Sequence, residues 1–359
     1  MKNMLGINEL RKNRNENNFQ EFNSWVKEFF RREYLRDYGD LNDYQPSHIA
    51  MREEVKYWNP NRSKHAEVHW LEHFVFGRTD ISIRNKILNA MAVKFVGMPT
   101  LTLVASNTAD YNNIIDFDRY ETDLEYQKTI QTNLNNNVHK LAVWGSTQLQ
   151  TSLQTAARNY CRDLYNDPNK KFQLSDMIDW MLHLDKLGLS ETVMNRDSTL
   201  GTVCDHLRQH RGIGPYFSYH PPCNFSRATE LYHIDEDDNY CLVGPGAKRG
   251  LEFVFPDIRF SNNDIMEEYI IAIRDHQHDF FEFKNSTEHE FYKNNLERGG
   301  NLTTFGVEIT LCQFDCFQNI KDNARAQEKR IVPLTFDSFV TIAENLKHKM
   351  NQGTLEQFI

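Results

Sequence analysis

The sequence predicts an all-α, or at least predominantly α-helical, protein of two lobes. Apolar side chains recur at steps of three and four residues along several stretches, which is the period of one helix face. Serine or proline precedes some of these stretches and glycine or proline follows them, as is typical of helix ends. The chain has 359 residues, 40% of them hydrophobic and 12% aromatic, which is enough for packed cores.

The N-terminal half is expected to consist of helices joined by polar loops. Residues 13–18 are polar and are expected to fray. Helices are expected at about residues 67–76, 83–95 and 146–165, and residues 101–105 (LTLVA) suit a short strand or a buried turn. An earlier helix should bury one apolar face, which is formed by Phe22, Trp25, Val26, Phe29, Phe30 and Tyr34.

The break Asn166-Asp167-Pro168 is the predicted boundary between the lobes, because such residues favour turns and end helices. We therefore predict an N-terminal helical lobe at residues 1–168 and a second lobe at residues 169–359. In the second lobe, Ser175 is predicted to cap a helix over residues 177–187. Ser198 is predicted to cap the helix that runs to about His210.

The chain carries no stretch typical of export or of membrane insertion. Residues 1–18 lack the apolar core of a secretory signal, and no apolar run approaches the roughly 20 residues that span a bilayer. We therefore expect a cytoplasmic protein without a membrane partner.

Six cysteines lie far apart in the sequence, which suits free thiols in a reducing compartment. Metal ligation is the alternative, because Cys312 and Cys316 are four residues apart and so are His206 and His210. Neither pair has a second close pair near it in the sequence that would complete a zinc site. The sequence therefore favours buried thiols and ordinary surface histidines. We predict no metal site.

The segment from Ser198 to Phe225 contains the first candidate site. A helix ends in a basic turn, Gly212-Ile213-Gly214 follows, and an aromatic-rich helix is predicted to begin at Pro215. Glycines keep the backbone N–H groups of such a turn accessible to a phosphate, and the N-terminus of a helix favours an anion. An ordinary glycine-ended turn between helices is the alternative. The predicted DNA contacts here are Arg208, Arg211, Gly212, Gly214, Tyr216 and His220.

The formal net charge of −9 argues against a nucleic-acid partner, because such proteins usually show a basic surface. The objection weakens if basic residues cluster in space, or if an enzyme needs only brief contact with the nucleic acid. DNA remains the predicted partner.

A second candidate site follows at residues 235–250. The acids of residues 235–238 precede a glycine turn at residues 244–246, which Lys248 and Arg249 follow. The acids suit a base or metal ligands, and the cations suit charge on a leaving group. A solvated acidic loop is the alternative, and a Walker loop is absent. The predicted catalytic residues are Asp235, Asp237, Asp238, Lys248 and Arg249, and Gly244 and Gly246 are further predicted DNA contacts.

These motifs resemble known families. Asp235 lies 23 residues after Gly212, similar to the spacing between hairpin glycine and catalytic aspartate in helix–hairpin–helix DNA glycosylases. A closer resemblance is to glycosylase-derived phage enzymes that hypermodify thymine: the α-glutamyl/putrescinyl-thymine pyrophosphorylase (amino acid:DNA transferase) families and the helical domain of 5-hydroxymethyluracil DNA kinases. Their pattern combines a GIGPF-type hairpin, an acidic position, a GPGA-x-RG element and a Cys-acid-Phe-Asp helix. Here these elements stand at residues 212–216, 235–238, 244–250 and 312–315.

The resemblance covers about residues 175–315 and shows departures. Gln313 stands where the family has an acid, although Glu308 lies one turn earlier. Glu308 and Asp315 are two helical turns apart, so they are functional candidates if they point inward and solubility charges if they point outward. The family's N-terminal motifs are not visible, and residues 84–95 are a candidate for their diverged counterpart.

The resemblance implies a two-lobed, helix–hairpin–helix glycosylase-like architecture and a reaction on DNA. An amine from an amino acid or a polyamine would displace pyrophosphate from a pyrophosphorylated 5-hydroxymethyluracil, after the base leaves the stack. Lys248 and Arg249 would stabilise the pyrophosphate, and Asp235 or Asp238 would take the proton. No cofactor is required, and Mg²⁺ is a candidate ion. In a phage protein, the cytoplasm would be that of the infected bacterium.

Two alternatives stay open. One is a DNA glycosylase that cleaves the N-glycosidic bond of a modified base, with an aspartate that stabilises the sugar cation. The other is a non-catalytic DNA-binding module. Substitution of Asp235, Asp237 and Asp238 distinguishes an enzyme from a binding module. An enzyme would lose turnover and keep binding, whereas a binding module would change little or bind better.

Overall fold

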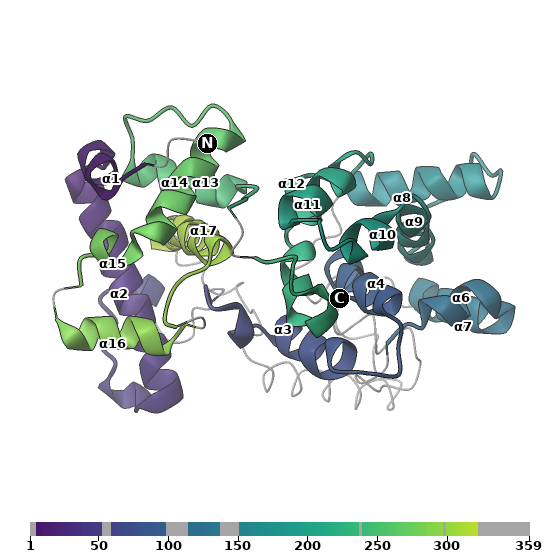
Figure 1. Cartoon of the computed structure of the whole chain (residues 1–359), viewed down its shortest axis with the longest axis horizontal. Helices are drawn as coiled ribbons and strands as arrows, with labels where there is room; N and C mark the ends of the chain where they lie inside the picture. The colour runs from purple at the N-terminus through teal and green to yellow at the C-terminus, as the bar shows by residue number, and fades with distance from the viewer. Residues whose placement is uncertain are drawn as a thin grey trace. The chain divides into compact units, whose positions relative to one another are not determined.

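A computed structural model describes residues 5–51, 59–97, 114–136, 151–236, 239–283, 285–296 and 299–321. These residues form helices and turns and contain no β-strand, which confirms the predicted all-α class (Figure 1). The predicted strand or turn at residues 101–105 lies outside them. Within the same residues, no helix combines the length and the apolar character that crossing a bilayer requires.

The chain divides into two compact units, and the division differs from the predicted lobes. One unit is Met1–His65 with Asp237–Leu334, and the other is Ala66–Glu236 with Thr335–Ile359. The boundary predicted at residue 168 therefore falls inside the second unit. The reason is that the N-terminal helices bury their apolar faces against helices more than 200 residues further along the chain, which local composition does not reveal.

The first unit is built around α17 (Thr304–Lys321), which packs against α13 (Pro245–Val254), α14 (Asn263–Asp275) and α2 (Glu16–Tyr38). Phe22 of α2 and Phe253 of α13 both contact Phe314 of α17, with ring centroids 5.0 and 5.1 Å apart. The other elements of this unit are α1 (Ile7–Asn13), α15 (Gln277–Phe280), α16 (Ser286–Asn294), and short 3₁₀ turns at Leu41–Asp43, Ile49–Met51 and Arg62–Lys64.

The apolar face predicted for the helix now labelled α2 is confirmed, except that Tyr34 is only half-buried. The expected fraying of residues 13–18 is wrong. Asn15 caps α2, Asn18 donates to the carbonyl of Phe253 at 2.7 Å, and Asn13 donates to the Tyr269 hydroxyl at 2.8 Å. The polar segment is therefore ordered by hydrogen bonds that its composition does not predict.

The second unit is built around α4 (Ile83–Ala92), which contacts helices that follow it in the chain. Phe95 stacks on Trp180 and meets Phe217 edge-on, with centroids 5.8 and 5.5 Å apart. The other helices are α3 (Ala66–Leu71), α6 (Phe117–Thr122), α7 (Leu124–Asn136), α8 (Thr151–Leu164), α9 (Ser175–Lys186), α10 (Leu189–Met194), α11 (Leu200–Arg208) and α12 (Pro215–Tyr219). Turns of π-helix at Glu72–Phe76 and Val93–Gly97 extend α3 and α4, and 3₁₀ turns lie at Pro222–Arg227 and Thr229–Leu231.

Two predicted helix caps are displaced. Thr199, not Ser198, caps α11 and accepts a hydrogen bond from the backbone N–H of Thr202 at 3.3 Å. Ser198 instead closes the preceding turn through its own N–H. Ser175 is the first residue of α9 and does not act as its cap.

Candidate functional site

The turn between α11 and α12 presents its backbone at Gly214. Gly212 has a positive φ of 93°, a conformation that other residues rarely adopt. Ile213 is buried and anchors the turn. A Cβ atom added at Gly214 would meet nothing within 4 Å, so this backbone is open to an approaching group. Pro215 is the first residue of α12, as predicted.

Basic and aromatic side chains flank this turn. Arg208 and Arg211 are exposed, and Arg208 lies 3.7 Å from Asp205 in a weak surface pair. Tyr216 and His220 lie with ring centroids 4.0 Å apart. Phe217 and Tyr219 are buried. We define the hairpin turn as Arg208, Arg211, Gly212, Gly214, Tyr216 and His220.

The acidic cluster divides between described and undescribed residues. Asp237 and Asp238 lie outside the described residues. Glu236 is buried, and its carboxylate lies 3.3 Å from the Arg227 guanidinium, so its role is structural. Asp235 is half-buried in the same unit as the hairpin turn.

The second glycine turn serves a close approach between helices. Gly244 caps α13 and Pro245 begins it. A Cβ atom at Gly246 would lie 2.6 Å from the sulfur of Cys312, and one at Gly250 would lie 2.6 Å from the carbonyl oxygen of Leu311. This packing explains both glycines without a phosphate. Contact of Gly244 and Gly246 with DNA therefore stays a prediction.

Glu308 lies on α17, and its side chain is buried against the start of α13. The backbone N–H of Gly244 donates to its Oε1 atom at 3.1 Å, and only 3% of the residue is exposed. Burial raises the pKa of this carboxyl to about 7, while the hydrogen bond from Gly244 lowers it. Its burial shows that Glu308 points inward, as one of the two alternatives required. A carboxyl with a pKa near neutrality also suits proton transfer. The predicted catalytic set did not include this residue.

The two predicted cations follow on the first turns of α13. The Arg249 guanidinium makes a bidentate pair with Asp315, at 2.8 Å from Nε and 2.7 Å from Nη2, and this pairing raises the pKa of Arg249. Asp315 therefore holds the Arg249 guanidinium in one orientation. Lys248 lies 3.6 Å from Glu252 and is 42% exposed. We define the α13 site as Gly244, Lys248, Arg249, Glu308 and Asp315.

The predicted residues thus form two groups, one in each unit. The hairpin turn and Asp235 belong to the second unit, and the α13 site belongs to the first. Sequence spacing had placed all of them in one lobe. The signal for Glu308 and Asp315 was present as their two-turn spacing on one helix.

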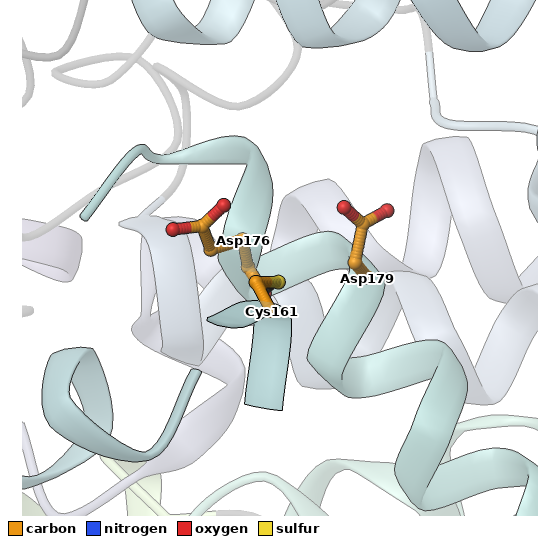
Figure 2. A group of neighbouring side chains, drawn as sticks. All are labelled: Cys161, Asp176 and Asp179. Carbon is orange, nitrogen blue, oxygen red and sulfur yellow. Dashed lines mark hydrogen bonds between the residues drawn. The ribbon is translucent and has the colours of Figure 1, made fainter. Parts of the chain in front are cut away.

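Among the described residues, one group of side chains has the spacing of metal ligands. Its ligand atoms, on Cys161, Asp176 and Asp179, lie within 4.8 Å of one another, and in Figure 2 the thiol lies between the two carboxylates. Burial raises the pKa of the Cys161 thiol, which disfavours the thiolate that a metal needs. The cysteine and histidine pairs that were the alternative in the sequence form no such group among the described residues. His206 and His210 have ring centroids 5.3 Å apart, and burial lowers the pKa of each.

Comparison with known proteins identifies relatives of this chain. The family described as "5-hmdU DNA kinase, helical domain" matches residues 53–325, which include the hairpin turn and the α13 site. The 5-hmdU DNA kinase of Bacillus phage SP10 is 29% identical over 110 residues, which are 29% of this chain and 17% of that protein. This match thus spans a small part of that relative. No solved structure matches.

Proposed function

The chain belongs to the family of the helical domain of 5-hmdU DNA kinases, and from this premise we propose that it hypermodifies thymine-type bases in DNA. Its substrate would be DNA that carries a pyrophosphorylated 5-hydroxymethyluracil. The second substrate would be a small amine, either an amino acid or a polyamine. The observation that carries the proposal is the family match over residues 53–325, because it includes both motifs that suit this chemistry.

The reaction would form a carbon–nitrogen bond and break a carbon–oxygen bond. The lone pair of the amine nitrogen attacks the methylene carbon attached to C5 of the base. The bond from that carbon to the pyrophosphate oxygen breaks, and its electron pair leaves with pyrophosphate. The amine arrives as an ammonium and loses one proton before the attack and a second after it, so a base is needed.

The α13 site offers groups for the departing pyrophosphate and for the proton. Lys248 and Arg249 carry positive charge on an exposed helix surface, and Asp315 fixes the orientation of Arg249. Glu308 has a pKa of about 7, which suits a general base at neutral pH. Asp235 is the alternative base that the family's acidic position favours. No cofactor is required, and Mg²⁺ is a candidate for balancing the phosphate charge.

The hairpin turn would hold the DNA backbone. Gly214 leaves its backbone open, and Arg208 and Arg211 supply exposed positive charge beside it. Contacts of this kind position a protein on DNA without reading the sequence. They would support a base that is turned out of the helix for reaction.

Mass spectrometry of nucleosides tests the proposal. DNA with pyrophosphorylated 5-hydroxymethyluracil is incubated with the protein and a pool of amino acids and polyamines, then digested. We expect a thymidine derivative that carries an amine and an equal amount of free pyrophosphate. Free base or abasic sites would instead indicate a glycosylase, and unchanged DNA would indicate a binding module.

Matched variants assign the roles. Lys248→Met, Glu308→Gln and Asp235→Asn should each lower the yield, and the last two distinguish the candidate bases. Lys128→Met removes an exposed surface lysine on α7 and serves as the charge control. Equal losses in Lys128→Met and Lys248→Met would contradict a specific role for the α13 site.

A further inference from the structure

A pocket of about 530 Å³ lies in the second unit, apart from the hairpin turn. Its volume is within the range of sites that hold small molecules. The start of α9, the loop before it, the end of α8 and one side of α7 form its walls. The lining is mostly polar and includes Gln131, Asn135, Tyr165, Lys170, Asp176 and Asp179.

Two buried carboxylates line this pocket. Asp176 is 1% exposed, and its Oδ2 atom accepts a hydrogen bond from the backbone N–H of Gln173 at 2.9 Å. Its Oδ1 atom is buried and receives no directed hydrogen bond from the described residues, although the Lys170 ammonium lies 3.0 Å away. This oxygen is ion-paired with Lys170, and because an ionised carboxylate oxygen has two lone pairs, it can accept a further hydrogen bond.

Asp179 lacks a compensating cation among the described residues. It is 7% exposed and accepts hydrogen bonds from the hydroxyls of Tyr120 and Tyr165, at 2.8 and 2.9 Å. Burial raises the pKa of its carboxyl, because neutral phenols do not replace the water that an anion loses. Lys170 forms an ion pair with Asp176, so the pocket carries more buried negative charge than positive charge.

The chemistry of the pocket favours an organic cation over a metal ion. The third potential ligand, Cys161, has a thiol whose pKa is raised by burial, which disfavours the thiolate that a metal ion needs. The volume also far exceeds that of an ion. An ammonium group, by contrast, has three N–H donors for carboxylate oxygens and leaves the rest of the molecule to contact polar groups such as Gln131 and Asn135.

We propose that this pocket binds a small molecule that carries a primary ammonium group, held between Asp176 and Asp179. The argument from charge and volume stands independently of the reaction. Only the identification of this molecule with the amine donor rests on the proposed function. In that case the pocket would be the binding site of the amine donor before its transfer.

Isothermal titration calorimetry on the full chain tests the pocket without DNA. The probes are putrescine, glycine and L-glutamate, with acetate as the compound that lacks an ammonium group and trimethylglycine as the compound that lacks its N–H donors. We expect at least one primary amine to bind at least tenfold more tightly than acetate and trimethylglycine. Putrescine against glycine and glutamate then distinguishes a polyamine from an amino acid.

Variants locate the binding. Asp179→Asn keeps the shape and removes the charge, and should weaken the binding of the amine at least tenfold. Asp163→Asn is the control, because Asp163 is an exposed residue of α8 that does not line the pocket. It should change the affinity less than twofold. The comparison of probes on the unsubstituted chain needs no variant, so it decides the matter even if Asp179→Asn does not fold.

Other outcomes overturn the proposal. They are binding of Mg²⁺ or Zn²⁺ with no binding of amines, equal affinity for glycine and trimethylglycine, and binding that Asp179→Asn leaves unchanged. Failure of the proposed function is a separate result. Amine binding without any transfer to DNA would keep the pocket and reject the reaction, whereas transfer without binding at this pocket would do the opposite.

Discussion

The two glycine turns of this protein look alike in sequence and differ in structure. Gly212-Ile213-Gly214-Pro215 and Gly244-Pro245-Gly246 both lead into a helix. At Gly214, a Cβ atom would stand in open space. At Gly246 and Gly250, it would collide with α17. The first turn keeps its backbone accessible, and the second lets two helices pack closely.

This difference shows that a glycine motif has no single physical meaning. The open turn suits a ligand that approaches from solvent, such as a phosphate. The packed turn instead positions Glu308 and Arg249 beside α17, so its contribution to a site comes from the side chains around it. Replacement of glycine by alanine should therefore cost much stability where α13 packs on α17 and little at Gly214.

The largest effect is expected from Gly250→Ala. Its methyl group would meet the Leu311 carbonyl at 2.6 Å, and backbone atoms of two packed helices do not give way easily. We expect a loss of about 3 kcal/mol in the free energy of unfolding. Urea unfolding measures the loss, and hydrogen exchange should rise in α13 and α17. Gly214→Ala is the control, with a change below about 1 kcal/mol. Equal losses at both positions would remove the distinction between the turns.

The next effect concerns the pH dependence of stability through Glu308. Its folded pKa of about 7 exceeds the ordinary value of 4.5 for a glutamate, so its contribution to stability is full below pH 4.5 and is lost as pH rises through 7. The loss is about 3 kcal/mol at most. Urea midpoints from pH 4.5 to 8 should fall less steeply for Glu308→Gln than for the unsubstituted chain. Parallel curves would show that Glu308 does not titrate in this range.

A smaller effect is expected from Gly212→Ala in the hairpin turn. The positive φ of 93° strains any residue with a Cβ atom, by about 1 kcal/mol. Thermal unfolding should show the cost, while Gly214→Ala, two residues later, should not. If both variants are equally stable, the turn does not hold the conformation described for Gly212.

The smallest effect is expected from Arg211→Ala on DNA binding. Loss of one phosphate contact should weaken binding severalfold and reduce the slope of log affinity against log salt by about 1. Fluorescence anisotropy of a labelled duplex at several salt concentrations measures both. Lys128→Ala on α7 is the control. An unchanged slope for Arg211→Ala would exclude this arginine from the DNA contact.

Local patterns predicted much of the fold correctly. The apolar face of α2 and the start of α12 at Pro215 both followed from the sequence. Each depends on residues within a few positions of one another. The prediction failed where distant contacts decide, as in residues 13–18, whose asparagines donate to Phe253 and Tyr269.

The candidate site was predicted in part. Residues of both motifs were identified from their types and order, but their roles as catalytic and DNA-binding groups stay predictions. Glu308 and Asp315 were left between inward and outward orientations. The helical period places them on one face of α17, yet only the packing of α13 against that face decides what the face meets.

The sequence by itself determined the helical class, the helix start at Pro215 and the family to which the chain belongs. These depend on local backbone preferences and on residue order. Tertiary structure alone decided which segments share a unit, why Gly246 and Gly250 lack side chains, and that Glu308 is buried beside Gly244. The physical reason is that burial and pairing depend on groups far apart in the chain, such as Gly244 and Glu308, which folding brings within a hydrogen bond.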